Sequence, residues 1–60
     1  MTTFEFKSER NWLKVHDTLD EAKCNICSYG YKAITCFDGR AEALLKEICF
    51  NSKIAYIVSE

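Results

Sequence analysis

Four cysteines are the residues of this 60-residue chain whose type and spacing are best suited to chemistry. Cys24 and Cys27 stand in the stretch KCNIC, with a spacing that is half of a common zinc motif and also that of a thiol–disulfide redox pair. Cys36 and Cys49 follow singly. A tetrahedral zinc site through Cys24, Cys27, Cys36 and Cys49, stabilising a small module, is therefore one hypothesis.

Two features of the cysteine pattern argue against both kinds of chemistry. Strong zinc signatures contain two tight pairs, and the second pair is missing here. Redox pairs stand at a helix N-terminus, whose dipole assists the thiolate, whereas Cys24 is expected well beyond a helix start at Thr18. The favoured interpretation is packing without a metal or cofactor: Cys36 and Cys49 in the core, Cys27 at its edge and Cys24 partly exposed.

Other signatures of catalysis are weak. His16, the single histidine, stands beside Asp17, but neighbouring residues of the strand expected there point to opposite faces. The 2 glycines of the chain do not suffice for a phosphate-binding loop or a dinucleotide fingerprint. A domain of this size also leaves little volume for a ligand pocket. The sequence therefore predicts a protein that is not an enzyme.

The charge of the chain argues against nucleic acid as a partner. Its 8 Lys and Arg residues and 9 Asp and Glu residues are interspersed, whereas a nucleic-acid-binding protein normally carries a basic patch. A weaker hypothesis remains, in which basic side chains contact phosphates and aromatic rings stack on bases. The residues for it would be Arg10, Lys14, Lys32 and Arg40, with Trp12 and Tyr31 as the stacking platforms.

The N-terminal residues and the lack of long apolar runs bear on location. The start MTTFEFKSER has neither the basic nor the apolar region of a signal peptide, and no apolar run reaches the ~20 residues of a membrane span. We therefore expect a soluble cytoplasmic protein without membrane partners, in the host cytoplasm if the chain is viral. Because thiols stay reduced there, the even number of cysteines does not predict a disulfide framework.

Hydrophobic periodicity predicts the elements of the first half of the chain. Residues 3–7 and 12–16 alternate between apolar and polar types and predict the two strands of a hairpin. Thr18 and Glu21 have the spacing of a capping box, which predicts a helix over 18–29 that ends at Gly30. A competing interpretation places one long helix from Glu9 through Cys27, because Trp12, Val15 and Leu19 also have helical spacing.

The second half of the chain has a clearer pattern. Residues 31–37 are rich in β-branched and aromatic types and predict a strand. A helix capped by Asp38 or Gly39 follows and ends near Asn51, and residues 53–58 predict a last strand.

These elements predict a small single α+β domain over residues 1–60, in the order ββαβαβ, with one sheet of about four strands and two helices packed on it. If the last two strands are neighbours, they run parallel through a right-handed crossover. In the alternative, they are antiparallel and lie apart in the sheet.

The functional prediction is based on the aromatic residues. Phe4, Phe6 and Phe37 are expected to fill the core, but the remaining large rings are hard to bury together in so short a chain. Exposed Trp, Tyr and Phe are typical of protein interfaces. We therefore expect a partner-binding surface, mainly on an open sheet face, formed by Trp12, Lys14, His16, Tyr31 and Phe50.

The function predicted from these observations is that of a non-enzymatic protein–protein interaction module. A small inhibitor, an antitoxin or a phage protein for host takeover or anti-defence would act in this way, by blocking a surface of a larger partner. A homodimer that buries the same aromatic residues is the other arrangement considered, since so short a chain is only marginally stable by itself.

Overall fold

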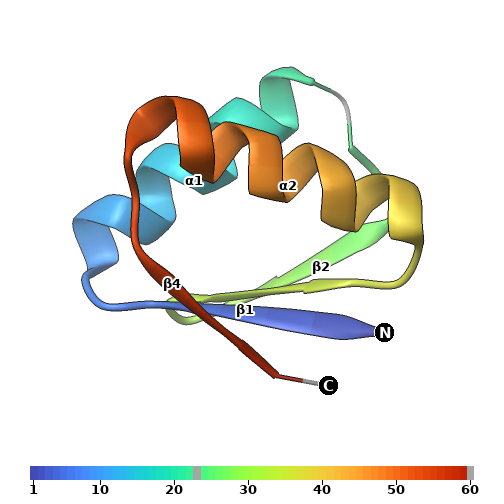
Figure 1. Cartoon of the computed structure of the whole chain (residues 1–60), viewed down its shortest axis with the longest axis horizontal. Coiled ribbons are helices and arrows are strands. Elements are labelled where there is room, and N and C mark those ends of the chain that lie inside the picture. Colours follow the sequence, from blue (N-terminus) through green and yellow to red (C-terminus); the bar gives the residue numbers. More distant parts are fainter. Residues whose placement is uncertain (23, 60) are drawn as a thin grey trace.

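The fold is known from a computed structural model that describes residues 1–22 and 24–59. Its elements in chain order are β1 (Thr2–Phe6), α1 (Glu9–Glu21), β2 (Cys27–Gly30), β3 (Ala33–Cys36), α2 (Gly39–Ser52) and β4 (Tyr56–Ser59). All neighbouring strands pair antiparallel, in the order β2-β3-β1-β4. Both helices cover one face of this sheet, and the other face is open (Figure 1). The arrangement is the split β-α-β, or ferredoxin-like, topology.

The first helix forms where the sequence provides a cap followed by helical spacing. Ser8 has an extended backbone, and its hydroxyl accepts a hydrogen bond from the amide of Asn11, at 3.2 Å. Val15 and Leu19, four residues apart, are then buried on one side of α1. The helix ends near Ala22, and the carbonyl of Leu19 accepts a hydrogen bond from the amide of Cys24 in the loop that leads to β2.

The second helix begins at Asp38, whose carboxylate accepts a hydrogen bond from the amide of Arg40. Its buried residues are Ala41, Leu45, Ile48 and Cys49. Lys53 ends the helix with a left-handed backbone (φ 54°), and its amide hydrogen-bonds to the last carbonyls of α2. The chain then turns back into β4.

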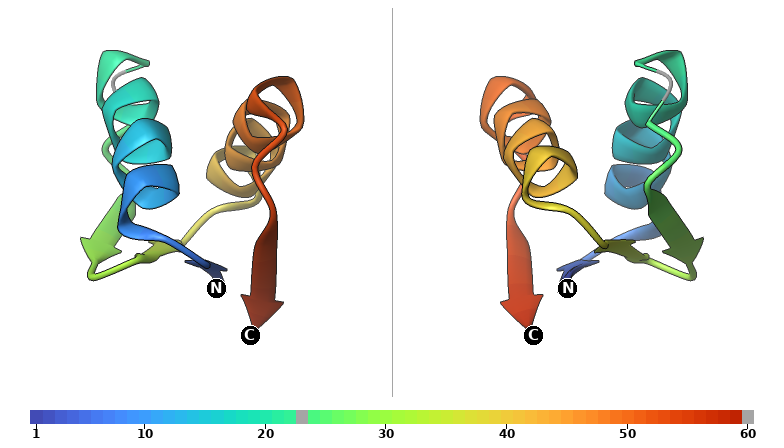
Figure 2. Two further views of the ribbon diagram at one scale, coloured as in Figure 1. Left: turned by 90° about the vertical axis from the view of Figure 1, so that its left-hand side faces the viewer. Right: turned by 90° about the vertical axis from the view of Figure 1, so that its right-hand side faces the viewer.

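The core lies between the sheet and the two helices. Alternation in β1 directs Phe4 and Phe6 to the helix side, and the ladder places Ile34 and Val58 on the same side opposite Phe4. The buried hydrophobic residues are Phe4, Phe6, Val15, Leu19, Ile34, Cys36, Ala41, Leu45, Ile48, Cys49 and Ile54. Figure 2 shows α1 toward the β2 side of the sheet and α2 toward the β4 side.

The fold class, the four strands and the two helices packed on one sheet are confirmed, but the order of the first elements differs from the prediction. The predicted strand over 12–16 is part of α1, and the predicted helix over 18–29 is replaced by the end of α1, a loop and β2. Lys23, which that helix included, lies outside the described residues. The competing helix that starts at Glu9 was the better interpretation, although it ends at Glu21.

The sheet topology also decides between the two arrangements of the last strands. β1 lies between β3 and β4, so these two strands are not neighbours. Because both are antiparallel to β1, they point in the same direction, which neither alternative stated in full. Phe37, expected in the core, is 55% exposed just beyond β3.

Candidate functional site

An aromatic row lies between α1 and β2. The ring of His16 lies between those of Trp12 and Tyr29, with centroid distances of 5.2 Å and 4.3 Å. The Trp12 indole Nε1–H also donates a hydrogen bond to the carbonyl oxygen of Ala33, at 3.1 Å. The row therefore connects the middle of α1 to both strands of the β2–β3 hairpin and is partly buried.

His16 does have acidic neighbours, but not on a strand. Its Nδ1 lies 3.6 Å from a carboxylate oxygen of Asp17 and 3.4 Å from one of Asp20, one helical turn away. Among the described residues, this Nδ1 and the hydroxyl of Tyr29 are buried atoms without a hydrogen-bond partner. Neither carboxylate is buried, so the two acidic groups lie on the solvated surface of α1, while the His16 ring packs against Tyr29.

The five residues predicted to bind a partner do not form one face. Trp12, Lys14 and His16 lie on α1 and not on the open sheet face, because the segment predicted as a strand is helical. Tyr31, in the β2–β3 turn, is 73% exposed, and Phe50, on α2, is 83% exposed. Phe50 was expected among the aromatic residues that the core cannot bury, and its exposure agrees with that expectation.

The residues considered for nucleic-acid binding also lie on separate elements. Arg10 and Lys14 belong to α1, Arg40 belongs to the first turn of α2, and Lys32 follows Tyr31 in the hairpin turn. The ammonium of Lys32 lies 5.3 Å from the centroid of the Tyr31 ring, so these two side chains contact each other.

Three cysteines form a thiol cluster that we define as Cys24, Cys27 and Cys36. The Sγ atoms of Cys24 and Cys27 are 3.1 Å apart, and those of Cys27 and Cys36 are 3.5 Å apart. The ladder explains the second contact, since Cys27 is the direct cross-strand partner of Cys36. The loop after α1 explains the contact between Cys24 and Cys27, because it places Cys24 next to the start of β2. Cys24 is thus in a loop and not in the middle of a helix as predicted.

Burial raises the pKa of Cys27, Cys36 and Cys49. Burial, and then hydrogen bonds and charge repulsion from Cys24 and Cys36, raise the pKa of Cys27 far above its usual value. Burial also raises the pKa of Cys36. In α2, burial raises the pKa of Cys49 to about 11, with a further contribution from Cys36.

The zinc hypothesis needs four convergent ligands. The structure brings Cys24, Cys27 and Cys36 together, while Cys49 is buried in α2 and joins none of the sulfur contacts found among the described residues. Within residues 1–22 and 24–59, no group of three or more His, Cys, Asp and Glu side chains has an arrangement suited to a metal ion. Zinc binding by these four cysteines stays a prediction.

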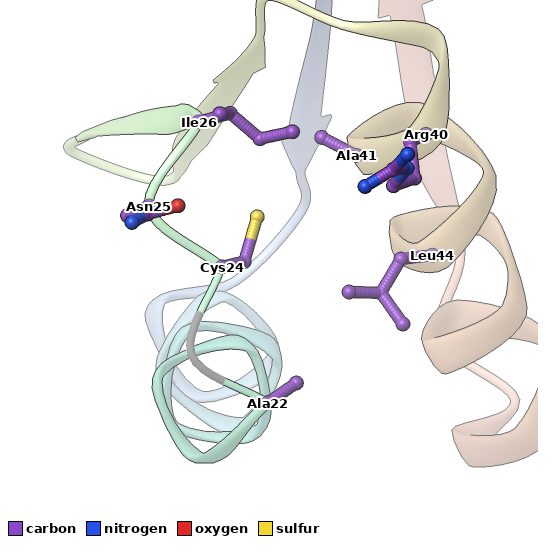
Figure 3. Close-up of a pocket in the computed structure, with 7 residues that line it drawn as sticks. All are labelled: Ala22, Cys24, Asn25, Ile26, Arg40, Ala41 and Leu44. Carbon is purple, nitrogen blue, oxygen red and sulfur yellow. The ribbon is translucent and has the colours of Figure 1, made fainter.

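A shallow cavity of ≈ 430 Å³ opens between the loop after α1 and the first half of α2. Figure 3 shows the sulfur of Cys24 directed into this space, with the guanidinium of Arg40 on the other side. Apolar side chains form most of its wall. The lining residues are Ala22, Cys24, Asn25, Ile26, Arg40, Ala41 and Leu44.

The β4 edge, which we define as the free side of strand Tyr56–Ser59, was not singled out from the sequence. Ile57 is 58% exposed and Val58 is 44% exposed, and β4 pairs only with β1 among the described strands. Ile57 is opposite Glu5 on the open face of the sheet, whereas Val58 is opposite the buried Phe4. The sequence did contain a signal for an exposed edge, because the strand segment YIVS has neither a charged residue nor a proline.

None of the described helices is long and apolar enough to cross a membrane. A scan against protein-family models and searches of curated proteins and of solved structures found no match to this chain.

Proposed function

We propose that this chain is a non-enzymatic interaction protein that binds an extended segment of a larger protein along the β4 edge. The observation that carries the proposal is the β4 edge itself, in which two exposed apolar side chains lie on a strand that pairs with β1 alone among the described strands. Such edges bind partners by adding a strand to the sheet.

The backbone of β4 supplies the attraction. In an antiparallel ladder, alternate residues of an edge strand direct their N–H and C=O groups away from the sheet. Natural proteins usually protect such groups with lysine, proline, a bulge or a covering segment. β4 has no lysine or proline, and the residues from Tyr56 to Ser59 keep regular pairing with β1.

The side chains of β4 determine which kind of partner segment fits the edge. Ile57 projects on the open face and Val58 projects toward the helix side, so an added strand would meet an apolar residue on each face. A partner segment with β-branched or aromatic residues on both faces fits this edge. By covering that segment, the chain would block a surface of its partner, as a small inhibitor, an antitoxin or a phage anti-defence protein does.

Photo-cross-linking tests the proposal. A benzophenone amino acid would replace Ile57 in one sample and Phe50 in a matched sample, because both positions are exposed and apolar but lie on different elements. After irradiation in a lysate of the source cells, cross-linked peptides would be identified by mass spectrometry. We expect position 57 to label one extended segment of one protein and position 50 to label it far less.

Two results would count against the β4 edge as the binding site. A specific product from position 50 alone would favour the predicted site that includes Phe50. Cross-linking of position 57 mainly to a second copy of the chain, together with a dimeric mass in solution, would show that self-pairing occupies the edge.

A further inference from the structure

The thiol cluster is not used by the proposed function, and its geometry is unusual for three residues that merely fill space. Cys24 and Cys27 are only partly buried, and their sulfur atoms are closer than an ordinary non-bonded contact, at 3.1 Å. A disulfide needs a further approach of the two sulfur atoms of about 1 Å. Cys24 also belongs to a loop, where the backbone can adjust at low cost.

We propose that Cys24 and Cys27 form a reversible disulfide by exchange with an anionic low-molecular-weight disulfide, of which oxidised glutathione is the model. Cys24 is the residue that meets the reagent, because its sulfur faces the cavity beside α2 (Figure 3). Cys27 lies behind it and closes the protein disulfide.

The steps balance as two successive thiol–disulfide exchanges. The Cys24 thiolate attacks one sulfur of the reagent, forms a mixed disulfide and releases one thiol, which takes up the proton that Cys24 lost. The Cys27 thiolate then attacks the Cys24 sulfur, and the second reagent thiol leaves with the proton from Cys27. Two protein thiols are oxidised, and one molecule of reagent disulfide is reduced to two thiols.

The position of the pair separates it from a thioredoxin-like oxidant. Cys24 follows the C-terminal end of α1 and does not begin a helix, unlike the first cysteine of a thioredoxin-like pair. Burial and the neighbouring thiols hold the Cys27 proton, so the second exchange is slow near neutral pH. A slow, reversible closure suits modification of this chain and not rapid oxidation of other proteins.

Arg40 gives the site its preference for an anionic reagent. Among the described residues that line the cavity, Arg40 is the charged one, and Figure 3 places its guanidinium across from Cys24. Carboxylates on the reagent would therefore be attracted toward the reacting sulfur. A neutral reagent such as 2-hydroxyethyl disulfide lacks this attraction.

The test is a time course of folded, fully reduced protein with oxidised glutathione, followed by mass spectrometry and peptide mapping. We expect the wild-type chain, Cys36→Ala and Cys49→Ala to lose two hydrogen atoms and to contain a Cys24–Cys27 bond. Cys27→Ser should stop at the mixed disulfide on Cys24, and Cys24→Ser should not form this bond. Circular dichroism checks that each variant is folded.

Arg40→Gln tests the choice of reagent. We expect it to slow the reaction with oxidised glutathione by about threefold and to leave the reaction with 2-hydroxyethyl disulfide unchanged. Equal effects on both reagents, or no effect on either, would overturn the anion preference.

Three outcomes would overturn the disulfide itself. The first is a wild-type mixed disulfide that never closes, and the second is a bond mapped to Cys36 or Cys49. The third is protein purified without chelator that carries zinc and resists oxidation until a chelator removes the metal.

Discussion

The two edge strands of the sheet differ in how much of the chain covers them. On the helix side of β2, Tyr29 packs against His16, which in turn packs against Trp12, and the first residue of β2 joins the thiol cluster. At the start of β4, the ring of Tyr56 lies at a tilt against that of Phe4, with the centroids 5.0 Å apart, and the residues after it are exposed. The comparison indicates that aromatic residues near β2 contribute mainly to stability, while the exposed β4 edge is where we propose that a partner binds.

Replacement of Trp12 should have the largest effect on stability. Trp12→Ala removes a partly buried ring and the hydrogen bond to Ala33, so we expect the free energy of unfolding to fall by about 2–4 kcal/mol. Urea denaturation followed by circular dichroism measures this loss. Phe50→Ala is the matched control, and its change should stay within about 0.5 kcal/mol because that ring is exposed. Equal losses in the two variants would refute a structural role for the aromatic row.

Alkaline pH should have the next largest effect, because it removes the stabilisation that the Tyr29 proton gives on the β2 side. Burial raises the pKa of Tyr29 from 10.0 to about 12, so the folded chain holds this proton more tightly than the unfolded chain. The stabilisation is fully present below pH 10 and is lost as the pH rises toward 12. We expect Tyr29→Phe to reduce the alkaline loss of unfolding free energy by about 1–2 kcal/mol.

The control for this pH effect is Tyr31→Phe, which alters an exposed tyrosine two residues away. Because this ring is exposed, its replacement should change the free energy of unfolding by no more than about 0.5 kcal/mol at neutral pH. Parallel curves for wild type and Tyr29→Phe would contradict the assignment.

Loss of the tilted ring pair formed by Tyr56 and Phe4 should have a smaller effect on stability. Tyr56→Leu keeps an apolar side chain beside Phe4 but removes the aromatic pair, so we expect a loss of about 0.5–1.5 kcal/mol. The urea midpoint measures this loss too. A loss as large as that of Trp12→Ala would mean that β4 carries as much of the stability as the β2 side.

Ile57→Lys should change stability least and binding most. The side chain is exposed on the open face, so the free energy of unfolding should change by no more than about 0.5 kcal/mol. A charge on an edge strand opposes the addition of another strand, so co-purification of the partner should be lost. Lys replacing Phe50 is the matched control and should retain the partner. Retention by Ile57→Lys would disprove the β4 edge as the site.

The sequence allowed the second half of the fold to be predicted well, for physical reasons. Asp38 caps a helix whose buried residues recur at one period, and the flanking strands are rich in β-branched residues. The segment 12–16 was ambiguous because its five residues fit both a strand and a helix. The decisive signal was local but easily missed, since Ser8 caps α1 through the amide of Asn11.

The candidate sites depend on tertiary structure and were harder to predict. The contact of Cys27 with Cys36 follows from the register of β2 on β3, which single-sequence periodicity does not fix. The exposure of Ile57 follows from the place of β4 at the sheet edge, and that place depends on β1 lying between β3 and β4. Only the exposure of Phe50 could be read from helical phase alone.

Hydrogen exchange on the purified complex with the cross-linked partner segment, compared with the free chain, tests the central claim most directly. We predict slower exchange at the outward-facing amides of β4 and unchanged exchange at β2. Slower exchange at β2 or around Phe50, with β4 unchanged, would contradict the account.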